Sequence, residues 1–356
     1  MKTADVTLRQ MLTHMLEHHA SDLHISAEAP IQMRVHGDLV PITEDLLNAE
    51  QCKRLCYEYL TETQTKAFEK EWELDCAISH TKEARFRVNL FFQQGTVGGA
   101  FRHIPTVIPT PEQLGMPDVA LKLADKPRGL VLVTGPTGSG KSTTLAAMIN
   151  KINHERGEHI ITIEDPIEFI HKSDKCLIVQ REVGEDTQSF GAALKRVLRQ
   201  DPDVVLVGEM RDLETIATAI TVSETGHLVF ATLHTNSAVQ TINRIIDVFP
   251  PHQQPQVRTQ LSFILEGVLT QQLVRKKEGG RALAMEVLIP NMAIRNLIRE
   301  DKVHQIYALM QMGQQQTGMQ TMNQALAAHY KAGTITKEEA LSCATEPEEI
   351  KKLLGM

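Results

Sequence analysis

A loop with the spacing required to bind phosphate groups is formed by eight consecutive residues, Gly135-Pro136-Thr137-Gly138-Ser139-Gly140-Lys141-Ser142. Its glycines let the backbone curl so that successive N–H groups point at one anion. An apolar run, 130–133, precedes the loop, and a helix-like segment beginning at Thr143 follows it, so the positive end of a helix dipole would face the same anion. Lys141 can reach the β- and γ-phosphates, and the Ser142 hydroxyl can ligate Mg²⁺. The residues from Gly135 to Thr143 therefore predict a site for a nucleoside triphosphate with Mg²⁺.

Carboxylates follow two predicted strands. The strand over 159–164 ends in Glu164 and is followed by Asp165 and Glu168, and the strand over 203–208 leads to Glu209. Because ligands of open α/β sheets bind at the carboxyl ends of the strands, we expect these four side chains near the phosphate loop. There a carboxylate could activate water or hold the metal. The alternative is that the acids cap helices or face solvent.

Histidines and arginines provide further candidates. His227 and His234 stand at the two ends of a predicted strand, and at least one of them could hydrogen-bond a γ-phosphate. Arg87 shares one face of its strand with Arg85, and Arg102 ends a later strand. Arginines stabilise the charge that develops in phosphoryl transfer. The alternatives are a structural histidine and ordinary surface arginines.

The 356 residues divide into segments of different pattern. Residues 1–103 read as a small α/β domain, and residues 104–112 form a proline-bearing linker. From 113 the order strand, loop, helix repeats, with aliphatic strands over 129–134, 159–164, 203–208 and 227–233. This pattern is typical of a doubly covered parallel sheet. Beyond Pro290 the pattern is helical to the end.

The composition excludes several classes of protein. The formal net charge of −7 disfavours a direct nucleic-acid partner. Five scattered cysteines without a CxxC pair give neither a disulfide framework nor a four-cysteine zinc site. Apolar runs are much shorter than the roughly twenty residues needed to span a bilayer. We therefore expect a cytoplasmic protein with no transmembrane segment and no signal peptide.

The order of the motifs resembles the secretion and type IV pilus ATPase superfamily. The residues that carry the resemblance are the phosphate loop, the acidic box 163–168, the segment 199–212, Glu-Thr-Gly-His at 224–227 and Thr-Leu-His-Thr at 232–235. Within that superfamily, the segment 293–300, Ala-Ile-Arg-Asn-Leu-Ile-Arg-Glu, looks like the retraction-specific segment of the PilT-type ATPases.

The resemblance implies a fold and an assembly. The implied fold is α/β: a PAS-like N-terminal domain over 1–103, a RecA-like P-loop ATPase domain over 113–290, and a C-terminal helical region over 291–356. It also implies a homohexamer that hydrolyses ATP with Mg²⁺ to power pilus retraction and twitching motility. Implied partners are a pilus platform protein of the inner membrane and possibly a PilU-like homologue, with the ring peripheral to that membrane.

The resemblance also implies roles for single residues. Glu168 is the first choice for the general base, and Glu164 in the same acidic box remains the alternative. Glu209 takes the Walker B position and would hold Mg²⁺ together with Ser142 and Asp165. The residues His227 and His234 fall in the family's His box. Arg87 and Arg102 match arginines that reach a nucleotide bound by the neighbouring subunit.

Other functions stay open at this stage. A PilU-type accessory retraction ATPase fits nearly as well as the PilT type, although 293–300 matches the latter better. A DNA-translocating ATPase is disfavoured by the acidic charge and the low aromatic content. A regulatory subunit that binds nucleotide without hydrolysing it is disfavoured by the intact acidic clusters and Lys141.

Overall fold

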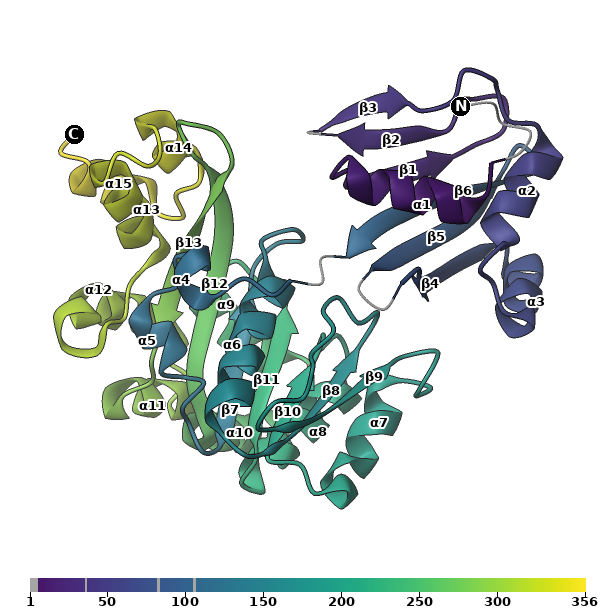
Figure 1. Cartoon of the computed structure of the whole chain (residues 1–356). Helices are drawn as coiled ribbons and strands as arrows, with labels where there is room; N and C mark the ends of the chain where they lie inside the picture. Colours follow the sequence, from purple (N-terminus) through teal and green to yellow (C-terminus); the bar gives the residue numbers. More distant parts are fainter. Residues whose placement is uncertain (1–5, 36, 82–83, 105–106) are drawn as a thin grey trace. The chain divides into compact units, whose positions relative to one another are not determined.

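The chain folds into two compact units, Met1–Val107 and Ile108–Met356, each with its own sheet and its own buried core (Figure 1). The computed structural model describes residues 6–35, 37–81, 84–104 and 107–356. Residues 105 and 106 of the predicted linker therefore lie outside the described residues. Within the described ranges, no helix is long and apolar enough to cross a bilayer.

The first unit is an antiparallel sheet with the order β3-β2-β1-β6-β5-β4 and three helices. Its elements are α1 (Leu8–Glu17), β1 (Asp22–Ile25), β2 (Gln32–Val35), β3 (Asp38–Pro41), α2 (Ala49–Tyr57), α3 (Glu62–Glu71), β4 (Glu73–Ser79), β5 (Arg85–Gln93) and β6 (Thr96–Ile104). Helix α1 is amphipathic and buries Leu8, Met11, Leu12 and Met15. On β5, alternate residues enter the core, so the arginines between them lie on the opposite face.

The second unit is built on a seven-stranded sheet with the order β13-β12-β7-β11-β10-β8-β9. Its strands are β7 (Gly129–Thr134), β8 (His159–Glu164), β9 (Leu177–Glu182), β10 (Val204–Val207), β11 (Leu228–Leu233), β12 (Leu265–Arg275) and β13 (Arg281–Leu288). All neighbours are parallel except β12 and β13. The four predicted strands are present, but the sheet is mixed. Three further strands, β9, β12 and β13, were not predicted, and polar residues in β9 and β12 interrupt the aliphatic pattern there.

Helices cover both faces of this sheet. They are α4 (Pro111–Leu114), α5 (Asp118–Leu121), α6 (Lys141–Glu155), α7 (Phe190–Val197), α8 (Leu213–Glu224), α9 (Ala238–Asp247), α10 (Gln254–Ile264), α11 (Met292–Arg299), α12 (Ile306–Thr317), α13 (Met322–Lys331), α14 (Lys337–Ser342) and α15 (Pro347–Leu353), with 3₁₀ turns η2 (Leu198–Gln200) and η3 (Val303–Gln305). Helices α5 and α6 pack on one face, and α7 to α12 pack on the other. Helices α13 to α15 share a smaller core with the β12–β13 hairpin.

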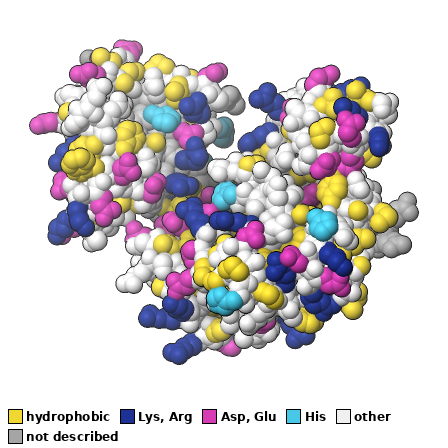
Figure 2. Space-filling model, turned by 180° about the vertical axis from the view of Figure 1, so that it is seen from behind, with side chains coloured by type: hydrophobic (Ala, Val, Ile, Leu, Met, Phe, Trp, Pro, Cys, Tyr) yellow, Lys and Arg dark blue, Asp and Glu magenta, His cyan; other side chains and the backbone are white. Residues whose placement is uncertain are grey.

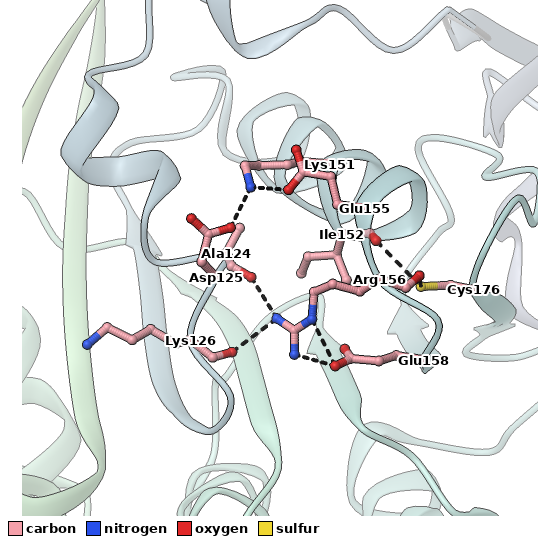
Figure 3. A network of polar contacts seen from close by, with 9 residues as sticks. All are labelled: Ala124, Asp125, Lys126, Lys151, Ile152, Glu155, Arg156, Glu158 and Cys176. Carbon is pink, nitrogen blue, oxygen red and sulfur yellow. Dashed lines mark hydrogen bonds and ion pairs between the residues drawn. The ribbon is translucent and has the colours of Figure 1, made fainter.

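The far end of α6 is anchored by the side chain of Arg156 (Figure 3). Its Nη1 donates to the backbone oxygens of Ala124, at 2.9 Å, and Lys126, at 3.1 Å, while Nε donates to Glu158 at 2.8 Å. The Cys176 thiol donates to the backbone oxygen of Arg156 at 3.1 Å. The Cys176 bond satisfies a carbonyl at the end of α6, and the Arg156 bonds fix α6 to the segment that leads into β7.

Charges of both signs are spread over both units on the face drawn in Figure 2, where Asp and Glu side chains accompany the Lys and Arg side chains. That distribution agrees with the overall charge of −7.

Candidate functional site

The phosphate loop joins β7 to α6 and has the backbone conformation that its glycines were expected to allow. Gly135, Gly138 and Gly140 have φ angles of 137°, 77° and 87°. Side chains are strained in this region of backbone space, so the glycines are required. A Cβ atom at Gly135 would lie 2.3 Å from the backbone oxygen of Gln271 and 2.7 Å from Ser139 Oγ. The loop thus packs directly on β12 and leaves no room there for a larger residue.

Lys141, the first residue of α6, folds its side chain back over the loop. Its Nζ donates to the backbone oxygens of Gly135, at 2.9 Å, and Pro136, at 3.1 Å. Burial lowers the pKa of Lys141, and the negative charges of Glu209 and Glu168 act in the opposite direction. The ammonium group therefore lies between the loop and the two carboxylates, where a phosphate group would replace the backbone oxygens as its acceptor.

His234 links Lys141 to Glu209. Its Nδ1 lies 3.4 Å from Lys141 Nζ, and its Nε2 lies 3.2 Å from Glu209 Oε1. A neutral imidazole with its proton on Nε2 would satisfy both contacts. Arg211 holds both oxygens of Glu209, with distances of 2.7 and 2.8 Å. Burial would raise the pKa of Glu209, but the hydrogen bond and charge of Arg211, together with the contact with His234, outweigh it and lower that pKa.

Glu164 ends β8 with its carboxyl group enclosed. Its Oε1 accepts hydrogen bonds from Thr162 Oγ1, at 2.6 Å, and Gln180 Nε2, at 3.3 Å. Burial raises the pKa of Glu164 to about 7, and the nearby charge of Glu168 adds to this effect. Asp165 is exposed, and its charge acts on Arg211. The acidic box thus contains one carboxyl group held in the wall of the sheet and others directed toward the basic side chains.

Ser142 and Thr143 are half-buried at the start of α6. Ser142 borders a cavity of about 30 Å³ that Glu164, His171 and Thr232 also line. Burial lowers the pKa of His171 to about 4, and its Nδ1 has no hydrogen-bond partner among the described residues. The cavity is large enough for one water molecule, and four polar side chains contribute to its lining.

Parallel pairing explains why these residues meet. Strands β7, β11, β10 and β8 are neighbours in register, so their carboxyl ends lie along one edge of the sheet. The phosphate loop, His234, Glu209 and the acidic box follow those four ends. The prediction that these segments come together is confirmed by the geometry, whereas their chemical roles stay predictions.

His227 was expected near the loop, and this expectation is wrong within the second unit. It precedes β11, whose first residue pairs with Gly129 at the amino end of β7. Seven residue steps of extended chain separate His227 from His234, which corresponds to about 23 Å. The Nδ1 of His227 instead lies 3.1 Å from both Thr225 Oγ1 and the backbone oxygen of Val222. Here it closes the end of α8.

Arg87 and Arg102 belong to the first unit and lie directly opposite each other on β5 and β6. Both are exposed. Arg102 Nε donates to Asp22 Oδ1 at 2.8 Å, and Asp22 stands opposite Arg102 on β1. The two guanidinium groups therefore share one open face of the antiparallel sheet, with the carboxylate of Asp22 beside Arg102.

The sequence profile of the Type II/IV secretion system protein family matches residues 3–342. The chain belongs to this family. It is 50% identical over 344 residues to the type IV pilus retraction ATPase PilT of Pseudomonas aeruginosa, covering 97% of this chain and 99% of that protein. It is 44% identical to the type IV pilus ATPase PilU of the same organism, covering 98% of this chain and 91% of that protein.

A solved structure supports the same relationship. The crystal structure of the pilus retraction motor PilT with bound ADP superposes with a TM-score of 0.92 at 48% identity, covering 98% of this chain and 100% of that one. The chain is thus a PilT-like retraction ATPase of the family, with an α/β fold in which an antiparallel sheet precedes a mixed, mostly parallel one.

The donor groups at the loop suit a magnesium ion that is bound mainly through phosphates and water. The hydroxyl of Ser142 lies in the first turn of α6, and the carboxylates of Glu209 and Asp165 both act on Arg211. Within the described ranges, no group of three or more His, Cys, Asp or Glu side chains could enclose a metal ion. Mg²⁺ in phosphate-transferring sites needs few protein ligands, so these residues fit it.

Four residues of the site were missed by the sequence analysis. Arg211 lies two positions after Glu209, so its proximity could have been noticed. Thr162 and Gln180 hold Glu164, and Gln271 touches the loop from β12. No local signal marks Gln180 or Gln271, because each reaches the site through strand pairing between distant segments.

Proposed function

We propose that the chain is an ATP-hydrolysing motor that powers the retraction of type IV pili. The observation that carries the proposal is the continuous series from the phosphate loop through Lys141 and His234 to Glu209, in a chain that matches PilT over almost its full length. ATP would bind with its phosphates on the loop amides and on Lys141.

The polar side chains of the candidate site in the second unit have the following proposed tasks. Ser142, Glu209 and Asp165 would hold Mg²⁺, which supplies charge neutralisation at the phosphates when bound. His234 would couple the position of the Lys141 side chain to that of Glu209, since it contacts both side chains. Glu168 remains our choice for the general base: its charge acts on Lys141, whereas Glu164 is held by two donors in the wall of the sheet.

We further propose a homohexameric ring. In it, Arg87 and Arg102 of one subunit would approach the nucleotide of its neighbour and stabilise the charge of the transferring phosphate. The two arginines lie side by side on an open sheet face, which suits a shared approach to one anion. A role for His227 would also require contact with another subunit, because within its own unit it is distant from the loop.

The proposed domains are a PAS-like domain over 1–103, a linker over 104–112, a RecA-like ATPase domain over 113–290 and a helical region over 291–356. Hydrolysis would change the angle between the PAS-like domain and the RecA-like ATPase domain. The ring would act in the cytoplasm on an inner-membrane platform protein, and a PilU-like homologue is a further proposed partner.

Phosphate release by the purified full-length chain tests the enzyme. We expect ATP hydrolysis that depends on Mg²⁺, on assembly, and on Lys141 and Arg102. If Arg102→Ala leaves the turnover of the assembled ring unchanged, the proposed shared site is wrong. If a stable monomer hydrolyses ATP at the full rate, the proposed ring mechanism is wrong.

Complementation tests the cellular role and separates the two retraction types. The chain should restore twitching to a strain that lacks PilT, and its Lys141→Ala variant should not, although pili still assemble. Restoration of a strain that lacks PilU, with no effect in the strain without PilT, would favour the accessory type. Stimulation of hydrolysis by single-stranded DNA would instead support a DNA-translocating ATPase.

A further inference from the structure

We propose that Gln271 is a positioning residue of the phosphate loop, whose side-chain amide fixes the orientation of the Ser139–Gly140 peptide group. The inference rests on the proposed binding of nucleotide phosphates by residues 135–142. It adds a residue from β12, a strand far from the loop in sequence, to the set that prepares the loop for its ligand.

Gln271 contacts the loop at two points. Its side chain is fully buried, and Nε2 donates to the backbone oxygen of Ser139 at 2.7 Å. Its own backbone oxygen lies where a Cβ on Gly135 would have to be, 2.3 Å from that position. One residue therefore supports the loop both at its first glycine and at the peptide that precedes its last glycine.

The direction of one peptide group explains why this support affects phosphate binding. The C=O and N–H of a trans peptide point in opposite directions. With the Ser139 oxygen held toward Gln271, the N–H of Gly140 is turned to the other side, where the loop presents its amides. Gly140 has no side chain and a φ of 87°, so without the bond the peptide could rotate at little cost. A rotated peptide would direct an oxygen at the phosphates.

Strand register brings Gln271 to this position. Thr270 is the last residue of β12 that pairs with β7, opposite Thr134, so Gln271 comes next to Gly135. The buried hydroxyls of Thr134 and Thr270 hydrogen-bond at 2.8 Å and hold this register. A slip of one residue would bring Gln272 next to Gly135 instead. It would also turn the Gln271 side chain to the other face of the sheet.

The second polar atom of Gln271 argues against a purely structural role. Within the part of the chain that the structure describes, the buried Oε1 of Gln271 has no hydrogen-bond partner. Such an atom lowers stability, and an apolar side chain of the same length would avoid that cost. A residue that only filled space would therefore be better replaced by methionine. The hydrogen bond from Gln271 Nε2 to the backbone oxygen of Ser139 explains why the side chain is an amide.

The experiment uses the full-length chain, the variant Gln271→Met and the matched control Gln272→Met, with ADP as the probe. Methionine has a similar length but no donor. We expect the Kd for ADP to rise about tenfold in Gln271→Met, the effect of losing one well-aligned hydrogen bond. The KM for ATP should rise by a similar factor with kcat within about twofold, because the loop amides bind substrate and transition state alike. Gln272→Met should bind ADP like the wild type.

Stability and hydrogen exchange complete the test. Without nucleotide, the thermal midpoint of Gln271→Met should stay close to that of the wild type, because removal of the unpaired Oε1 offsets the loss of the bond to the buried Ser139 oxygen, while amides of 135–141 exchange faster. Unchanged ADP affinity in Gln271→Met would overturn the inference. A loss of ADP affinity that accompanies a lower thermal midpoint, with unchanged hydrogen exchange of the loop amides, would also overturn it. Should that variant not fold, Gln271→Asn, which is too short to reach Ser139, must show the same weaker binding. A wild type that does not bind ADP would refute the proposed function itself, and with it the role of Gln271.

Discussion

The enclosed carboxyl group of Glu164 should make the second unit less stable as the pH rises. Its pKa is raised to about 7 by burial, from an ordinary value of 4.5. Replacing it by glutamine removes the ionisation but keeps an oxygen that can accept from Thr162 and Gln180. The substitution therefore isolates the effect of the charge.

The sign and size follow from the two pKa values of Glu164. Below pH 4.5 the group is protonated in the folded and the unfolded chain, so its contribution to stability is fully present. Above that pH the unfolded chain ionises first, and the contribution is lost as the pH rises through about 7. At about 1.4 kcal/mol for each pKa unit, the loss is about 3 kcal/mol.

Urea unfolding at pH 5 and pH 8, followed by far-UV circular dichroism, measures this loss. The wild type should lose about 2–3 kcal/mol more than Glu164→Gln between the two pH values. The only tryptophan of the chain, Trp72, lies in the first unit, so its fluorescence gives an internal reference that the substitution should not affect.

Glu278→Gln is the matched control, because Glu278 is exposed on the turn between β12 and β13. It should follow the wild type at both pH values. Parallel behaviour of the wild type and Glu164→Gln from pH 5 to pH 8 would refute the reasoning, since the carboxyl group would then ionise equally in both states.

Substitutions at three further positions test the packing and the charges of the second unit. Gly135→Ala should weaken ADP binding at least about tenfold in a direct titration, because its Cβ would lie 2.3 Å from the backbone oxygen of Gln271. Arg211→Ala should raise the pKa of Glu209 and move the acidic limb of the ATPase pH profile upward, whereas Arg211→Lys should move it less. Glu286→Gln should lower the free energy of unfolding in urea by about 1–3 kcal/mol, because the buried carboxylate accepts from the first residues of both α9 and α13 and an amide cannot accept with both atoms.

The elements of the site could be read from local patterns. The phosphate loop needs glycines, a lysine and a hydroxyl at fixed spacing, and aliphatic runs mark β7, β8, β10 and β11. Because parallel strands share one carboxyl edge, the order of these strands also predicted that Glu164, Glu209 and His234 would meet the loop. The same reasoning misjudged His227, since a histidine at the amino end of a strand lies at the opposite edge of the sheet.

The sequence by itself determined the class of protein and the chemistry of its ligand, because both depend on residue types at short, fixed spacing. Only the tertiary structure decided which distant side chains support that chemistry. Gln271 reaches the loop through the register of β12 on β7, and Gln180 reaches Glu164 through the pairing of β9 with β8. The enclosure that raises the pKa of Glu164 likewise comes from packing between segments far apart in the chain, for which no local pattern exists.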